Sequence, residues 1–283
     1  MSAQPQPSLE VVCLLYYVGH LANAQNSAGF VKYRPAMLKI DLHTHTADDP
    51  ADRIPYQTHE LLHRAAELGF DCLAITLHDR QLDPEALRSY AAAHGMVLIP
   101  GIERTIEGRH VLLLNYSRAA ESVDSFDALA RLREREQGLV IAPHPFFPSS
   151  KALRGALTRY AHLFDAVEWN GMFTRALNFN APAERWARRH GKPLVGNGDV
   201  HRLEQLGTTY SLVDAAPTPD AICEAIAAGR VRVVARPHSA LTAARLMADL
   251  VASTLLPRTT RTTRTIRTIR TIRTIRTIYS STD

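Results

Sequence analysis

Potential metal ligands follow directly after most of the short apolar runs of this chain. Two groups of them are pairs with i, i+2 spacing, His43 with His45 and Asp199 with His201. In a β-strand, residues two apart point to the same side, so each pair directs two ligand side chains toward one point. The other candidates are His78, Glu103, His110, His144 and Glu168. The chain must therefore fold so that the ends of many strands meet.

Short apolar runs and helical patterns alternate along the sequence. The apolar runs predict strands at 37–41, 72–76, 96–100, 110–114, 139–142, 166–169, 193–196, 210–213 and 231–234. Apolar residues recur at helical spacing over 57–68, 83–94, 125–135, 177–190 and 219–228. This alternation predicts an α/β fold with a mostly parallel sheet, either a barrel or doubly wound. Ligands from six or seven strands converge only if the sheet closes, which favours a (β/α) barrel with the site at the C-terminal strand ends.

Composition bears on one class of function, the binding of duplex nucleic acid. The 283 residues suffice for one large α/β domain or two small ones. The net charge of +5 is concentrated at one end, because the seven arginines from Arg258 onward and Asp283 contribute 7 − 1 = +6 and leave −1 for the rest. A nearly neutral body gives no support for a duplex-binding surface. The three cysteines are too few for a disulfide framework, which fits a reducing, cytoplasmic location.

The two ends differ from the body. Residues 11–18 are apolar and Ala22-Asn23-Ala24 follows them, as in a signal peptide, but no basic residue precedes the run and it is too short to span a bilayer. We expect residues 1–36 to be a poorly ordered N-terminal extension, with Met37 as an alternative start and secretion as the less favoured reading. We expect the barrel at 37–257. The Arg-Thr-Ile repeats in 258–283 fit neither helical nor strand periodicity and predict a disordered tail.

Six short segments together resemble a known family. They are DLHTH at 41–45, AITLHD at 74–79, PGIE at 100–103, APHP at 142–145, VEWN at 167–170 and GDVH at 198–201. In this order they resemble the successive motifs of the PHP (polymerase and histidinol phosphatase) domain, over about residues 37–236. The resemblance implies a distorted (β/α)7 barrel that binds up to three divalent metal ions and hydrolyses phosphoesters.

The resemblance also implies roles for individual residues. It assigns metal ligation to His43, His45, His78, Glu103, His144, Asp199 and His201. Glu103 matches a carboxylate that bridges two ions, and His110 resembles a histidine that often follows it. For the acid expected after the first pair we favour Asp49, ahead of Asp48 and Asp52. The acid that usually precedes the histidine of the second motif is Leu77 here. Catalysis is assigned to Glu103, Asp199 and His201.

These ligand types indicate the chemistry. Imidazole together with carboxylate suits Zn, Mn or Fe, and eight or nine ligands exceed what one ion can take, which favours two or three ions. Clustered ions polarise phosphoryl oxygens and lower the pKa of a bound water toward 7, so that a hydroxide nucleophile forms. We therefore expect metal-dependent hydrolysis of a small nucleotide or other phosphomonoester. The alternatives are a 3′–5′ exonuclease-type phosphodiesterase and a non-catalytic metal-binding regulatory barrel.

Substrate contacts are harder to assign. Arg80, Arg175 and Arg202 lie near motif ends, where arginine can bind phosphate through two hydrogen bonds, and Lys151 lies near another. Glu168 is a further candidate for substrate binding. The expected partner is a small phosphorylated substrate, with nucleic acid only as a substrate and no membrane.

A competing zinc motif occurs at His59-Glu60-Leu61-Leu62-His63, which fits H-E-x-x-H. The predicted helix would place both histidines on one face. However, no third ligand lies near in sequence, and a barrel would place this helix on its outer layer. A metalloprotease is therefore disfavoured.

Overall fold

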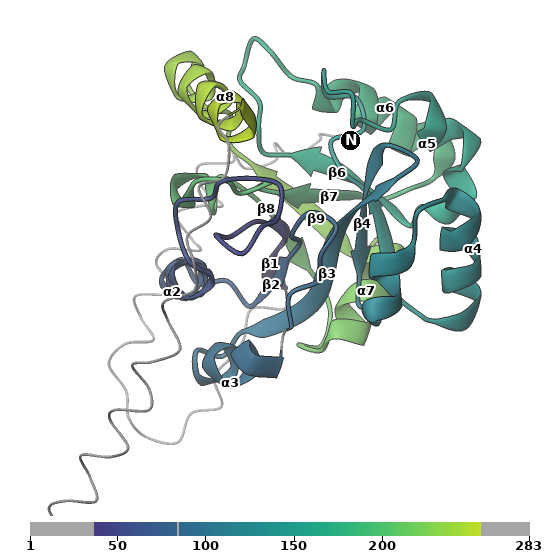
Figure 1. Cartoon of the computed structure of the whole chain (residues 1–283), viewed down its shortest axis with the longest axis horizontal. Helices are drawn as coiled ribbons and strands as arrows, with labels where there is room; N and C mark the ends of the chain where they lie inside the picture. Colours follow the sequence, from purple (N-terminus) through teal and green to yellow (C-terminus); the bar gives the residue numbers. More distant parts are fainter. Residues whose placement is uncertain (1–36, 84, 256–283) are drawn as a thin grey trace, which may run out of the picture. The chain divides into compact units, whose positions relative to one another are not determined.

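The computed structural model describes residues 37–83 and 85–255. The predictions for the N-terminal extension and for the Arg-Thr-Ile tail lie outside these residues. The described strands are β1 (Leu38–Thr44), β2 (Cys72–Ile75), β3 (Val97–Ile106), β4 (Arg109–Leu114), β5 (Leu139–Ala142), β6 (Ala166–Asn170), β7 (Leu194–Asn197), β8 (Thr209–Val213) and β9 (Val231–Ala235). They form one sheet in the order β7-β6-β5-β4-β3-β2-β1-β8-β9 (Figure 1).

Strand directions in this sheet are mixed. The pairs β1–β2, β2–β3, β5–β6 and β6–β7 are parallel. The pairs β3–β4, β4–β5, β1–β8 and β8–β9 are antiparallel. The prediction of a mostly parallel sheet is therefore wrong, and the count of seven β/α units is not confirmed. One reason is the link between β3 and β4, where only Glu107 and Gly108, both at positive φ, separate the strands. A two-residue turn of this kind makes a hairpin, because a parallel crossover needs a dozen or more residues.

The sheet is nearly closed into a barrel where β7 approaches β8 and β1. The Ser211 hydroxyl bridges the strands, since Gly196 N donates to it at 2.8 Å and it donates to Gly196 O at 3.1 Å. A Cβ at position 196 would lie 2.8 Å from Tyr210 O, so glycine is required for this approach. Beyond β7, Val200 N donates to His43 O at 3.3 Å. The closure brings the C-terminal ends of β1 and β7 together.

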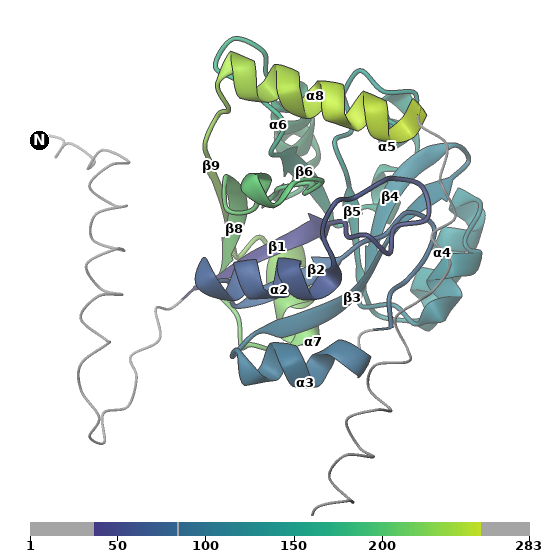
Figure 2. The same ribbon diagram turned by 60° about the vertical axis from the view of Figure 1, so that its left-hand side comes forward.

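Helices surround this sheet (Figures 1 and 2). They are α2 (Thr58–Glu67), α3 (Glu85–Ala93), α4 (Phe126–Arg135), α5 (Gly155–Arg159), α6 (Asn180–His190), α7 (Pro219–Ala227) and α8 (Ala240–Leu255), with the 3₁₀ turns η2 (Arg118–Ser122), η3 (Ala161–Leu163) and η4 (Leu203–Gln205). Five α-helices match predicted ones within a few residues, whereas α5 and α8 were not predicted.

Apolar faces of these helices pack on the sheet. On α4, for example, Phe126, Leu129 and Leu132 are buried in the same cluster as Val140 and Val167. The Ser125 hydroxyl caps this helix by accepting from Ala128 N at 3.2 Å. Burial of side chains of this size stabilises a fold by about 1.5–3 kcal/mol each. The strand ends that carry the candidate ligands are thus held on a rigid framework.

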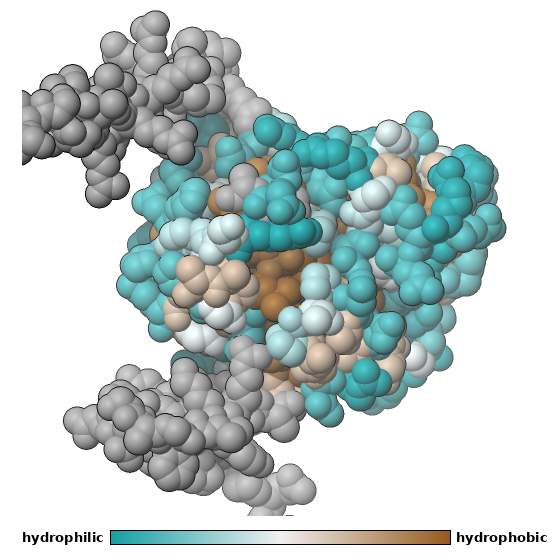
Figure 3. All heavy atoms as spheres, turned by 90° about the horizontal axis from the view of Figure 1, so that it is seen from below, coloured by the Kyte–Doolittle hydropathy of each residue, from teal (hydrophilic) through white to brown (hydrophobic). Residues whose placement is uncertain are grey.

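The surface is mostly polar on the face seen from below in Figure 3, with hydrophobic side chains gathered in a smaller area near its middle. Within residues 37–83 and 85–255, every helix is too short or too polar to cross a membrane. The cytoplasmic location stays a prediction.

Candidate metal centre

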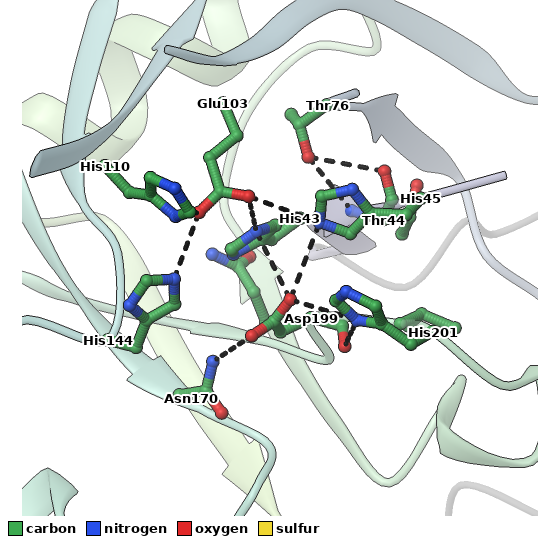
Figure 4. Close-up of polar contacts among 12 residues, drawn as sticks. His43, Thr44, His45, Thr76, Glu103, His110, His144, Asn170, Asp199 and His201 are labelled. Atoms are coloured by element: carbon green, nitrogen blue, oxygen red, sulfur yellow. Dashed lines mark hydrogen bonds and ion pairs between the residues drawn. The ribbon is translucent and has the colours of Figure 1, made fainter. Parts of the chain in front are cut away.

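Four ligand atoms from three strand ends converge at one point (Figure 4). His43 lies in β1 and His45 just after it, Glu103 lies in β3, and Asp199 follows β7. His43 Nε2 lies 3.3 Å from Glu103 Oε2 and 3.4 Å from Asp199 Oδ1. His45 Nε2 lies 3.4 and 3.5 Å from the same two oxygens. Two imidazole nitrogens and two carboxylate oxygens therefore face one common space.

These four atoms fit a divalent cation better than they fit hydrogen bonds. The Nε2 atoms of His43 and His45 are buried, and neither has a hydrogen-bond partner within residues 37–83 and 85–255. Their distances to the oxygens exceed the usual N–H···O length of about 2.7–3.2 Å. A tetrahedral ion with bonds of about 2.1 Å separates its ligands by about 3.4 Å. Two imidazole nitrogens and two carboxylate oxygens at these four separations could hold a divalent cation.

Glu103 also faces three further imidazoles, two of them through its other oxygen, Oε1. Its Oε1 lies 2.7 Å from His110 Nδ1 and 3.0 Å from His144 Nε2. His78 Nε2 lies 3.1 Å from Oε2. The carboxylate is only 1% exposed. Its two oxygens can therefore serve two ions, as a bridging ligand does.

A third group lies beside Asp199. His201 Nδ1 lies 3.4 Å from Asp199 Oδ1, and His201 Nε2 lies 3.0 Å from Asp52 Oδ2. The same Asp52 oxygen lies 4.0 Å from His78 Nδ1. His45, Asp199 and His201 form a further group of potential metal ligands, so donors for another ion lie on this side of Asp199.

Asp49 lies behind two of the imidazoles. Its Oδ2 lies 2.9 Å from His45 Nδ1 and 3.0 Å from His78 Nδ1, and it accepts from His78 N at 3.0 Å. Its Oδ1 accepts from the amides of Ala51 and Asp52. A carboxylate on Nδ1 holds the proton there and leaves Nε2 available to a metal. Asp49, the predicted ligand, is therefore placed to orient ligands.

Glu168 has a similar place behind His43. It is fully buried, and its Oε1 accepts from His43 Nδ1 at 2.8 Å and from Asn197 Nδ2 at 3.0 Å. Its Oε2 accepts from His144 N at 2.7 Å and from Asn170 Nδ2 at 3.1 Å. Four donors thus surround the carboxylate of Glu168, which was predicted from sequence to contact the substrate.

Two residues without a predicted role help to shape the centre. Asn170 Nδ2 donates to Asp199 Oδ2 at 3.0 Å, which fixes that carboxylate (Figure 4). Asp41 accepts from Gly198 N at 3.0 Å and from His43 N at 3.2 Å, so it joins β1 to the turn before Asp199. Burial raises the pKa of Asp41 to about 8, against these two amides, which lower it. Both residues lie inside the six motifs, which was the available signal.

The carboxylates and imidazoles of the centre shift one another's pKa values. Burial lowers the pKa of His43, but Asp199, Glu168 and Glu103 outweigh it and raise this pKa well above its usual value. Burial also lowers the pKa of His78, and carboxylates headed by Glu103 raise it to about 9. Burial raises the pKa of Glu103, but the imidazoles, His110 first, hold it well below the usual value. Ionised carboxylates facing protonated imidazoles form a site in which a cation can displace protons.

Backbone strain accompanies two of the ligands. His144 has φ 29° and Asp199 has φ 50°, both in the left-handed region. Such a conformation costs a non-glycine residue about 1–3 kcal/mol and persists only where the surroundings enforce it. The surroundings here are the hydrogen bonds from His144 N to Glu168 and from Asn170 to Asp199. The fold thus tolerates strain to aim these side chains.

The centre lies at the base of a pocket of about 440 Å³. Arg202 lines this pocket, and its Nε donates to Asp249 Oδ2 of α8 at 3.0 Å. Lys151 also lines it. Arg80 and Arg175 are exposed and are not among the residues that line it. The structure therefore brings one of the three candidate arginines to the site.

The H-E-x-x-H segment lies elsewhere. Glu60 caps its own helix, since its Oε2 accepts from Gln57 N at 2.6 Å. His63 Nε2 lies 3.3 Å from Glu67 Oε1, and the His59 ring meets the Tyr90 ring edge-on. Across the part of the chain that the structure describes, no cluster of potential metal ligands includes His59 or His63.

Comparison with known proteins gives the following. A family model described as PHP-associated matches residues 178–231. One similar crystal structure is that of a two-domain protein from Bacteroides vulgatus ATCC 8482, described as containing a predicted PHP-like metal-dependent phosphoesterase. The TM-score is 0.57 and the sequence identity is 20%. The match covers 76% of this chain and 70% of that one. The crystal structure of PsfC from Pseudomonas syringae PB-5123 is similar with a TM-score of 0.55 and 17% identity, over 77% and 98% of the two chains. No curated protein matches.

At these identities the structural matches show the fold. The family match is confined to residues 178–231.

Proposed function

We propose that this protein is a metal-dependent phosphoesterase, which hydrolyses a small nucleotide or other phosphomonoester with two or three Zn, Mn or Fe ions. The observation that carries the proposal is the Glu103 carboxylate, which lies within 3.4 Å of nitrogens of five histidines. In two of these histidines, Nε2 has no hydrogen-bond partner in the part of the chain that the structure describes. The proposed domain comprises residues 37–257. The fold of PHP-like phosphoesterases supports the same assignment.

The residues divide into ligands and groups that orient them. His43, His45, Glu103 and Asp199 would hold one ion, Glu103 with His78, His110 and His144 a second, and His201 with Asp52 would serve a third. Ions bound here would polarise the phosphoryl oxygens and lower the pKa of a water. Asp49 keeps the proton of His45 on Nδ1, and Glu168 does so for His43. We therefore assign these two acids to orientation rather than to ligation or substrate binding.

Positive charge near the pocket suits a phosphorylated substrate. Arg53, Lys151 and Arg202 line the pocket. Arginine and lysine can donate to the phosphate oxygens that do not react, which fixes the ester relative to Glu103.

The two alternatives are weaker for different reasons. A pocket of about 440 Å³ with α8 in its wall has the size of a small-molecule site, which favours a small ester over the 3′ end of a polymer. A regulatory barrel that has lost catalysis would be expected to lack ligands, whereas all nine residues predicted here as metal ligands belong to five overlapping groups of potential ligands.

Removal of single ligands tests the proposal. His43→Ala and Asp199→Ala should each abolish phosphate release from small esters, because each opens the first ion site. His59→Ala, which changes an exposed histidine outside the centre, is the control for folding and activity. Circular dichroism should show the same fold in all three variants. Full activity in either ligand variant would contradict the proposed site.

A further inference from the structure

One wall of the pocket is apolar, and α8 supplies much of it. Leu246, Met247, Leu250 and Val251 line the pocket. Their spacing of i, i+1, i+4 and i+5 places them on one face of the helix. Asp249, between them, holds Arg202 at 3.0 Å and so fastens α8 beside His201. The helix therefore presents a continuous hydrophobic strip to the metal centre.

Apolar residues from two other loops complete this wall, and each is fixed to the centre. Phe147 lines the pocket; its amide donates to His144 O at 3.0 Å, and its ring packs edge-on against Phe179. Met172 also lines the pocket, and its amide donates to Asn170 Oδ1 at 2.8 Å. Asn170 in turn holds Asp199. The backbone that carries Phe147 and Met172 is thus fixed relative to the proposed ligands.

The geometry points to a substrate whose alcohol part is apolar, in the first place an aromatic ring, held between α8 and Phe147 while its phosphate lies at the metal centre. A sugar or polyol against this wall would lose hydrogen bonds to water, because Met172, Met247 and Leu250 offer none through their side chains. Polar residues such as Arg53, Ser149 and Gln205 also line the pocket, and they suit the phosphate and its surroundings rather than the group against the wall. An aromatic ring gains from burial and can meet Phe147 edge-on or offset. This inference rests on the proposed function, since it needs the phosphate at the metal centre.

Binding measurements test it without requiring turnover. Metal-loaded protein should bind 1-naphthylmethylphosphonate at least about tenfold more tightly than hydroxymethylphosphonate in isothermal titration calorimetry, a difference of about 1.4 kcal/mol. Leu250→Asn should remove most of this preference, because it places an amide in the apolar wall at similar volume. Leu241→Asn is the matched control: it is the same substitution on the same helix, at a side chain that is 82% exposed. It should bind both phosphonates as the parent protein does.

Kinetics separates this inference from the proposed function. We expect kcat/KM for 1-naphthyl phosphate to exceed that for glycerol 2-phosphate by at least about tenfold. Hydrolysis of all esters at similar rates, or equal effects of the Leu250 and Leu241 variants on both phosphonates, would overturn the apolar subsite and leave the hydrolase. Tight binding of the aromatic phosphonate with no hydrolysis of any ester would overturn the hydrolase and uphold the subsite.

Discussion

Replacement of Glu168 by glutamine should weaken metal binding although the side chain keeps its shape. Its two oxygens accept four hydrogen bonds, from His43 Nδ1, Asn197 Nδ2, His144 N and Asn170 Nδ2. In glutamine, one oxygen becomes an NH2 group, which faces two donors in either orientation. Neither asparagine can reverse its amide without loss, since Asn197 Oδ1 accepts from Leu42 N and Asn170 Oδ1 from Met172 N.

The two orientations have different costs. If the NH2 group faces His144 N and Asn170, two buried donors lose their acceptor, at about 1–3 kcal/mol each. If it faces His43, the imidazole can adapt only by moving its proton to Nε2, the atom that the first ion needs. Loss of such an orienting group typically lowers metal affinity by about 10–100-fold. That factor corresponds to about 1.4–2.7 kcal/mol.

Competition with a chromophoric chelator measures this affinity directly. Glu168→Gln should bind ions about 10–100-fold more weakly than the parent and should unfold at lower denaturant concentration. Glu184→Gln is the control, because Glu184 forms an exposed ion pair with Arg188 on α6. If Glu168→Gln binds metal as tightly as the control and shifts only KM for the substrate, Glu168 contacts substrate and the orienting role is refuted.

Three further predictions concern the centre and the domain limits. Glu103→Gln should bind at least one ion fewer by elemental analysis, whereas His63→Ala should keep the parent metal content; the reverse pattern would favour the H-E-x-x-H segment. A chain truncated to residues 37–257 should remain folded and bind metal, and loss of either by the truncated chain alone would contradict these limits. The raised pKa of His78, about 9, adds stability to the metal-free protein below about pH 6.5 that is lost as the pH rises through 9. Metal binding at pH 7.5 should therefore release protons, seen as a dependence of titration heats on the buffer, and heats that do not vary with the buffer would contradict it.

Local patterns predicted the elements of this fold well, because apolar runs and helical spacing depend on neighbours in sequence. All nine strand positions correspond to observed strands within a few residues, apart from the longer β3. The direction of the strands was harder to predict from sequence. The Glu107-Gly108 pair between two apolar runs was a local signal for a hairpin, and the prediction of a mostly parallel sheet did not take it into account. The seam at Gly196 and Ser211 depends on contacts between distant segments, which spacing alone does not encode.

In the metal centre, too, some features were predicted from local sequence and others were not. Pairs such as His43 and His45 were predicted because strand geometry places i and i+2 on one side. The orienting roles that we propose for Asp49 and Glu168 were not predicted, because an orienting acid and an acidic metal ligand look alike in sequence. Only contact with Nδ1 or with Nε2 of the imidazole tells them apart. The apolar wall was also missed. A helical pattern in 240–255 can show that a helix forms, but not that it packs over a site.

The most direct test of the account is phosphate release from a panel of small phosphomonoesters as metal-free protein is titrated with Zn, Mn or Fe. The account predicts no release without metal, release that reaches its maximum only after two or more ions bind per chain, and none in Asp199→Ala at any metal concentration. Saturation of the parent protein with two or more ions and no release from any ester would contradict it, and would leave a metal-binding barrel without catalysis.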